Sequence, residues 1–383
     1  MITPALLVWA REQAGLSLAA AARRLKQPRE RLSTWESGDA RPTMKQAREL
    51  GKLYGQALGT LYLDAPPDEP ALPPDYRGRD AQEPYSPALL AEVRRTRATR
   101  DAAIDLSREL EQPFPQLDLR LTLEAAPAVA AREVRTWLGA PSGSPKPWHN
   151  VGEAFAWWRR RIESKGILVF VARHVPPEEM SGFTIAADAG PAIVINGADP
   201  PARRVFSLLH ELAHALLRQG GVSSLSSMHA PKIERFCNEV AARTLIPGQE
   251  LRSHRLARGR APEGPQTTWS AEDLKRLAAD FGTSVQAAYL RLVDEKLASR
   301  DAYARWLSQF GQKFEKIEHK GEGGPDFYTL KIHDLGRPYL ERVFDAFHAD
   351  AIPLASVCDL LGVKADTARK LESRLAEDLL KAS

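Results

Sequence analysis

The chain has 383 residues, enough for two or three domains, and 43% of them are hydrophobic, which is ample for buried cores. Its formal net charge of +4 is mild and does not by itself indicate nucleic-acid binding. Its two cysteines exclude a disulfide-rich scaffold and fit a reducing compartment. No run of about 18 apolar residues occurs and the first residues lack the pattern of a signal peptide, so we expect a cytoplasmic protein without a membrane span.

Residues 4–62 predict a bundle of five short helices. Ser17 is placed to cap the second helix, over residues 18–25, and proline and glycine flank the third, over residues 29–37. Short helices with a tight turn between the second and third are typical of a helix-turn-helix module. Residues 1–60 hold ten Lys or Arg against five Asp or Glu, so the excess positive charge is concentrated in this module.

Four residues of this module are the candidate DNA contacts, from the third helix and the loop after it: Arg29, Arg31, Thr34 and Arg41. The phrases Ser33-Thr-Trp-Glu-Ser-Gly38 and Arg41-Pro-Thr43 resemble the XRE (Cro-like repressor) helix-turn-helix. That resemblance implies binding to an operator. Leu18 stands where those repressors often carry Gln against the DNA backbone, so a protein-interaction role stays open as the alternative.

Residues 64–85 contain six prolines among polar residues and predict a semi-extended linker. Within it, Leu72-Pro-Pro-Asp-Tyr-Arg77 resembles a segment that often follows the helix-turn-helix in fused proteins of the family named below, and we expect it to dock the linker on the next domain. Residues 86–111 then predict a long or broken helix, and the alternation in Leu119–Leu123 predicts a short strand.

After a helix over residues 129–138 and another over residues 153–165, three apolar runs predict the strands of a small sheet. These runs are Ile167–Ala172, Gly182–Ala186 and Ala192–Asn196. We expect the last of them to be the edge strand. The prolines that follow it are placed to begin the next helix.

The run Phe206–Arg218 predicts a buried helix that carries His210-Glu211-Leu212-Ala213-His214. Two histidines four residues apart share one helix face, so both imidazoles can reach one metal ion. Glu211 follows the first histidine directly and could take a proton from the water that such a metal activates. The alternative is a pair of satisfied histidines on a core helix.

A second helix is predicted from Ile233 up to Pro247, and it offers a third ligand. Glu234 could complete a His, His, Glu set, and Asn238, one turn later, could orient a liganding histidine. Glu239 competes for the ligand role, but on an ideal helix it points about 140° away from Glu234. A solvated helix face remains the alternative for Glu234.

Two further residues near this pattern have an open interpretation. His229, in the polar loop between the two helices, could stabilise an oxyanion, although a solvent-exposed histidine is the simpler interpretation. Cys237 could have a redox or metal-binding role, although a buried small residue is the simpler interpretation.

The two helices, with the run Arg203-Arg-Val-Phe-Ser-Leu-Leu-His-Glu-Leu-Ala-His214, resemble the ImmA/IrrE family of metallopeptidases. Cys237 and Val240 replace the Ala and Phe that are usual there, and both keep apolar character. The resemblance implies a zinc-dependent endopeptidase, with manganese as an alternative to zinc. Its implied metal ligands are His210, His214 and Glu234, with Glu211 as the catalytic base.

The same resemblance implies the partners: a protein substrate that is an XRE-type repressor or antitoxin-like regulator, cut in a stress response, and DNA through the first domain. The alternative function is a DNA-binding transcriptional regulator or antitoxin whose metal domain senses or dimerises rather than cleaves. A homodimer stays open, and no membrane is expected.

The rest of the chain is predicted to be helical over residues 250–300 and over three helices in residues 336–380. Between them, Gly321–Pro325 and Phe327–Ile332 predict a hairpin within residues 310–335. The expected fold class is therefore α+β and mainly helical, with a small three-stranded sheet in a zincin-like domain. The expected domains are a helix-turn-helix at 1–63, a linker at 64–85, a metallopeptidase domain at 86–250 and a helical C-terminal region at 251–383.

Overall fold

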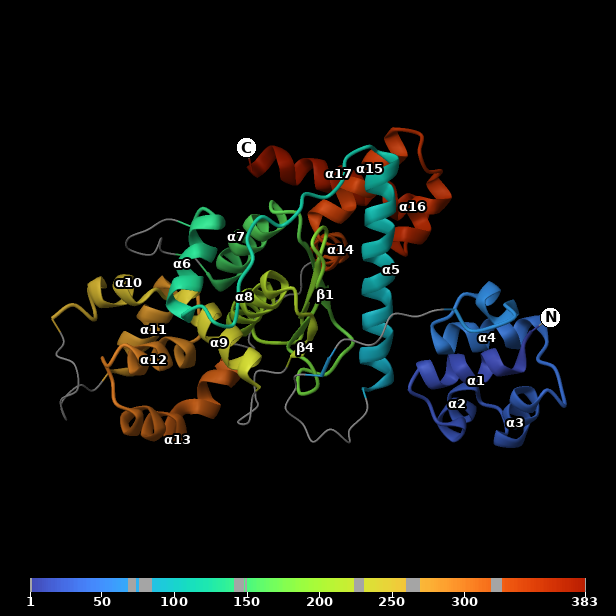
Figure 1. The fold of residues 1–383 in the computed structure, drawn as a ribbon, viewed down its shortest axis with the longest axis horizontal. Helices are drawn as coiled ribbons and strands as arrows, with labels where there is room; N and C mark the ends of the chain where they lie inside the picture. The colour runs from blue at the N-terminus through green and yellow to red at the C-terminus, as the bar shows by residue number, and fades with distance from the viewer. Residues whose placement is uncertain are drawn as a thin grey trace. The chain divides into compact units, whose positions relative to one another are not determined.

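A computed structural model of the chain forms two compact units, Met1–Leu72 with Arg79–Arg95 and Pro73–Gly78 with Thr96–Ser383 (Figure 1). None of the helices in the part of the chain that the structure describes is long and apolar enough to cross a membrane. The structure describes residues 2–67, 74–75, 85–140, 148, 150–223, 231–259, 269–317 and 326–382.

The first unit contains the predicted five-helix bundle, and the fifth element is a short 3-10 helix. Its elements are α1 (Pro4–Gln13), α2 (Leu18–Leu25), α3 (Arg29–Ser37), α4 (Met44–Tyr54) and η1 (Leu58–Tyr62). The Ser17 hydroxyl accepts a hydrogen bond from the backbone N–H of Ala20, as expected for the cap of α2. Thr43 and Gln46 form a capping box at α4, so local sequence sets both helix starts.

A salt bridge fixes α3 against α1 in this unit. The Arg11 guanidinium donates two hydrogen bonds to Glu36, at 2.7 Å and 3.0 Å, and both side chains are largely buried. A forked pair of this kind sets orientation as well as distance. Leu32 and Trp35 complete the contact by entering the core. The remaining face of α3 is therefore held outward.

Three helices of the described residues lie between the linker and the first strand. Helix α5 (Pro87–Glu109) is a single unbroken helix, followed by α6 (Pro127–Trp137). The predicted strand at Leu119–Leu123 does not form. The backbone N–H of Leu121 instead donates to the carbonyl of Leu216, and Leu121 packs into the core. The alternation there reflects the packing of an irregular segment and not a strand ladder.

The sheet has four strands, one more than predicted, and its order is β1-β3-β2-β4. After α7 (Val151–Glu163) these strands are β1 (Leu168–Ala172), β2 (Gly182–Ile185), β3 (Ala192–Asn196) and β4 (Gly221–Ser223). β3 pairs in parallel with β1 and antiparallel with β2, and β2 pairs antiparallel with β4. The prediction that Ala192–Asn196 is the edge strand is therefore wrong. All five of its residues are buried, as is typical of a continuous apolar run inside a sheet.

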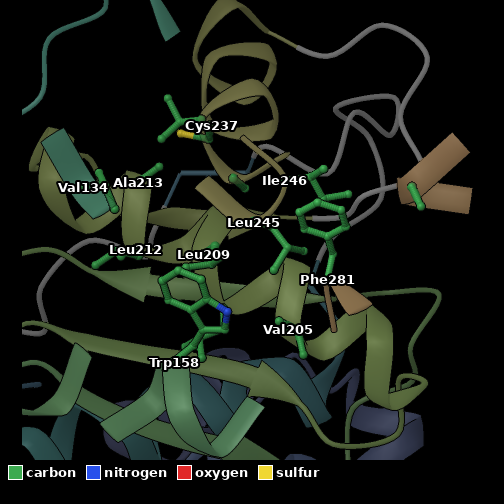
Figure 2. Packing of buried hydrophobic residues seen from close by; sticks show 14 of the residues in the cluster. Val134, Trp158, Val205, Leu209, Leu212, Ala213, Cys237, Leu245, Ile246 and Phe281 are labelled. Carbon is green, nitrogen blue, oxygen red and sulfur yellow. The ribbon is translucent and has the colours of Figure 1, made fainter. Parts of the chain in front are cut away.

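Helix α8 (Pro201–Leu217) packs against β2, β3 and α7, and α9 (Lys232–Leu245) packs on it. Pro201 is its first helical residue, as predicted. Most residues of α8 are buried, including both histidines and Glu211. Figure 2 shows part of the apolar cluster to which both helices contribute, with Leu209, Leu212 and Ala213 from α8 and Cys237 from α9. This packing holds the two helices at a fixed separation.

All regular elements in the described residues of the C-terminal part are helices. Its helices are α10 (Gly248–Ser253), α11 (Ala271–Asp280), α12 (Val285–Asp294), α13 (Arg300–Ile317), α14 (Phe327–Leu335), α15 (Arg337–His348), α16 (Leu354–Leu361) and α17 (Ala365–Ala382). The predicted hairpin within residues 310–335 is wrong, because residues 310–317 belong to α13 and Phe327–Ile332 to α14. Its Gly321–Pro325 part lies outside the described residues. Asp326 accepts hydrogen bonds from the backbone N–H groups of Tyr328 and Thr329, and this cap starts a helix at the segment for which a strand was predicted.

Candidate metal centre

Three side chains from α8 and α9 converge on one point. The Nε2 atoms of His210 and His214 are 3.2 Å apart. The carboxylate oxygens of Glu234 lie 3.3 Å from His210 Nε2 and 2.8 Å from His214 Nε2. All three side chains are buried, and they form the one group of potential metal ligands found among the described residues.

These separations fit a tetrahedral divalent ion. Bonds of about 2.0 to 2.1 Å place neighbouring ligand atoms roughly 3.3 Å apart, close to the spacing of the three atoms here. Two imidazole Nε2 atoms that face each other in a buried site also need a cation or a shared proton between them. Burial would raise the pKa of Glu234, but hydrogen bonds and charges from the two histidines outweigh it and lower the pKa to about 2. The three residues therefore offer the donor set that zinc prefers.

Glu211 lies beside this group but is not one of the three. Its carboxylate is buried, and its Oε2 accepts a hydrogen bond of 2.7 Å from the Thr184 hydroxyl of β2. Burial raises the pKa of Glu211 to about 7, against the opposing effects of His214 and the Thr184 and Ser223 hydroxyls. A carboxylate with a pKa near neutrality is suited to both accept and return a proton.

The candidate DNA contacts lie on the first unit, and three of the four are arginines with exposed side chains: Arg29, Arg31 and Arg41. Arg31 lies over the ring of Trp35, 5.7 Å from its centre, which orders the guanidinium. Thr34 is half-buried, and its hydroxyl donates to the backbone carbonyl of Arg31 at 2.9 Å. The structure thus presents the arginines outward and turns the Thr34 hydroxyl toward its own helix.

Comparison with protein-family models gives two matches. Residues 162–293 match the IrrE N-terminal-like domain, which is a peptidase family, and residues 7–61 match a helix-turn-helix family. The chain carries an IrrE-like domain and an XRE-type helix-turn-helix domain. No curated protein matches the chain. The IrrE-like match begins in α7 and ends in α12, so it contains the sheet and both helices of the candidate metal centre.

The IrrE-like domain supports its candidate ligands with residues that the sequence did not indicate. The backbone carbonyl of Gln219 lies 3.2 Å from His214 Nδ1, which directs the Nε2 atom of that ring toward the site. The Ser223 Oγ lies 3.5 Å from His214 Nε2, at the end of β4. Both residues follow α8 closely in the chain, so their nearness to the histidine helix was the available signal.

Other predicted residues have different surroundings in the IrrE-like domain. Asn238 is half-buried and hydrogen-bonds neither histidine, so its predicted role stays a prediction. Glu239 is exposed and pairs with Arg243 at 3.3 Å, which separates it from the candidate ligands. Cys237 is fully buried, and burial raises the pKa of its thiol, as expected for a packing residue. His229 lies outside the described residues.

Gly182 allows β2 to pass close to Glu211. A Cβ atom at this position would lie 2.9 Å from Glu211 Cγ and 2.9 Å from the backbone oxygen of Val194. Such contacts are shorter than real Cβ atoms show, and one of them is to backbone that cannot turn away. The absence of a side chain at Gly182 therefore helps to set the position of the Glu211 carboxylate.

Proposed function

We propose that the protein is a zinc-dependent endopeptidase that cleaves a protein substrate, an XRE-type repressor or antitoxin-like regulator. The observation that carries this proposal is the convergence of His210, His214 and Glu234 beside a separate buried carboxylate, Glu211. A metal site with a purely structural role needs no such carboxylate next to it. Manganese is the alternative ion. The division of the chain into domains at residues 63, 85 and 250 is part of the proposal.

In this mechanism the two helices supply the metal site and α8 also supplies the base. A zinc ion held by the three side chains would lower the pKa of a coordinated water and polarise the scissile carbonyl. Glu211 accepts the proton of the attacking water and returns it to the leaving amine. Thr184 holds the Glu211 carboxylate at 2.7 Å, so that its position does not depend on the substrate.

The test is incubation of the purified protein with XRE-type repressors encoded next to its gene. A single new pair of fragments, identified by intact mass and abolished by a chelator, would support the proposal. If every repressor remained intact whether zinc or manganese was added, the proposal would be contradicted. Metal analysis of the purified protein distinguishes zinc from manganese.

A second candidate function is a DNA-binding transcriptional regulator or antitoxin whose metal domain senses or dimerises. The exposed arginines of the helix-turn-helix domain favour DNA binding, and both activities can occur in one chain. In the combined form the first domain would deliver the peptidase to a repressor that is bound to DNA.

The DNA-binding part predicts that a double change of Arg29→Ala and Arg31→Ala weakens operator binding at least tenfold. Each lost phosphate contact should also reduce the salt slope of log K by about one. Titrations at several salt concentrations measure both effects. Arg108→Ala, which changes a highly exposed arginine of α5, is the matched control and should leave both unchanged. If Arg108→Ala weakened operator binding as much as the double change, Arg29 and Arg31 could not be assigned as DNA contacts.

For the peptidase, we expect Gly182→Ala to reduce hydrolysis at least tenfold while the metal stays bound. The added methyl group displaces Glu211, because its nearest contacts are atoms of Glu211 and the backbone oxygen of Val194 and not atoms of the candidate ligands. Turnover and metal content are measured together. Gly59→Ala is the control, because a Cβ there meets nothing within 4 Å. Unchanged turnover in Gly182→Ala would contradict the prediction, because it would show that the position of the Glu211 carboxylate does not depend on the missing side chain at residue 182.

A further inference from the structure

One face of the sheet lies against the side chain of Glu211. Directly paired residues of an antiparallel ladder point to the same face, and so do residues two positions apart on one strand. Because Gly182 of β2 pairs with Ser223 of β4, Ser223 shares its face with Gly182 and Thr184. Thr184 hydrogen-bonds the Glu211 carboxylate, and a Cβ atom at Gly182 would meet the Glu211 side chain. The side chain of Ser223 therefore extends from β4 toward the same carboxylate.

Backbone pairing on both sides of β4 sets the position of Ser223. On the inner side, the carbonyl of Ser223 accepts a hydrogen bond of 3.0 Å from the backbone N–H of Ser181, the residue before β2. On the outer side, the backbone N–H of Val222 donates a hydrogen bond of 2.8 Å to the carbonyl of Pro74. Ser223 is fully buried, so its hydroxyl needs a partner inside the protein.

The Ser223 hydroxyl lies near both His214 and Glu211. Its Oγ is 3.5 Å from His214 Nε2, which is at the outer limit of a hydrogen bond. The Gln219 carbonyl at Nδ1 of the same ring directs the Nε2 lone pair toward the ligand group. The hydrogen bond of Ser223 to the Glu211 carboxylate lowers the pKa of that group, against the larger effect of burial. The hydroxyl proton is therefore directed to the carboxylate.

We propose that Ser223 is a positioning residue: its hydroxyl holds the Glu211 carboxylate from β4, as the Thr184 hydroxyl holds it from β2. This inference rests on the proposed peptidase function, in which Glu211 is the base. Two donors on adjacent strands fix the plane of a carboxylate that a single donor would leave free to turn about its terminal bond. Gly182, which pairs with Ser223, leaves the space that the carboxylate occupies.

Hydrolysis tests the assignment through Ser223→Ala, which removes one hydroxyl group and leaves the backbone pairing of β4 unchanged. We expect kcat to fall about tenfold, as for the loss of one hydrogen bond to a charged group, while KM and zinc affinity stay the same. Ser207→Ala is the matched control. Ser207 is also a buried serine, one turn before Glu211 on α8, but its hydroxyl has no hydrogen-bond partner in the part of the chain that the structure describes. The control should keep kcat, and a Ser223→Ala protein that kept it too, or that lost its metal, would overturn the assignment.

A second background separates positioning from a general effect on the fold. In Glu211→Gln protein the base is already absent, so adding Ser223→Ala should lower the residual rate by no more than about twofold. A further loss as large as that in the unchanged chain would show that Ser223 acts independently of Glu211, and it would overturn the proposal.

Carbon NMR of the Glu211 side-chain carboxyl group tests the contact without any hydrolysis. In zinc-supplied protein with isotope-labelled glutamate, at one fixed pH, the resonance of Glu211 is the one that Glu211→Gln removes. We expect Ser223→Ala to shift this resonance and Ser207→Ala to leave it in place, because only Ser223 hydrogen-bonds the carboxylate. An unshifted resonance in Ser223→Ala would overturn the proposal. If the resonance shifts but the unchanged chain cleaves no repressor, the peptidase function fails while the contact between Ser223 and Glu211 stands.

Discussion

Glu211→Gln is expected to reduce hydrolysis at least a thousandfold while the metal remains bound. General acid–base catalysis contributes roughly a hundredfold to ten-thousandfold, and an amide cannot accept the proton that the carboxylate takes. The amide has nearly the same shape, and its oxygen can still accept the hydrogen bond of Thr184. Because Glu211 lies outside the three-residue ligand group, its loss should not empty the site.

The measurement is kcat for repressor cleavage beside metal content per chain. Glu239→Gln is the matched control, since Glu239 is an exposed glutamate on the neighbouring helix. The control should keep both values. A Glu211→Gln protein that cleaves at the rate of the unchanged chain would assign the base to another residue, and one that lost its metal would make Glu211 a ligand.

Glu234→Ala is expected to reduce metal affinity at least a hundredfold and to remove the stabilisation that metal provides. Glu234 is the only member of the described ligand group on α9, so it connects that helix to the two histidines of α8 through the ion. Metal at a thousand times its Kd stabilises a folded protein by about 4 kcal/mol. Glu234→Ala should therefore lose most of this metal-dependent increase in the free energy of unfolding.

Competition with a coloured chelator measures the affinity, and thermal unfolding with and without added zinc measures the stabilisation. Glu239→Ala, five residues later on the same helix, separates the loss of the ligand from a general effect on α9. If zinc still raised the unfolding temperature of Glu234→Ala as much as that of the unchanged chain, the His, His, Glu site would be excluded.

The candidate ligands could be predicted from sequence because helical geometry relates them. A four-residue spacing places His210 and His214 on one face, and the helical pattern after Ile233 brings Glu234 into reach. Thr184 and Gly182 could not be predicted in this way. They approach Glu211 because β2 packs against α8, and this packing brings together residues such as Thr184 and Glu211 that are 27 positions apart in the chain.

The errors in the predicted fold have local causes. β4 has only three residues, which is too few for an alternating pattern to be recognised in the sequence. The sheet was therefore predicted with three strands, and β3 was predicted as an edge strand although it lies between β1 and β2. The residues of α14 favour a strand by composition, but the cap at Asp326 selects a helix. In both cases the structure depends on an interaction that the hydrophobic pattern of the segment does not contain: the pairing of β4 with β2, and the cap of α14 by Asp326.

The pairing of Pro74 with Val222 has a consequence for any shortened form of the protein. A fragment that begins after residue 86 would keep the sheet but lose the segment on its outer edge. An uncovered strand edge invites pairing between identical molecules, and so it promotes aggregation. Expression of the isolated IrrE-like domain should therefore start before Pro73, with the proline-rich stretch retained as a solubility element.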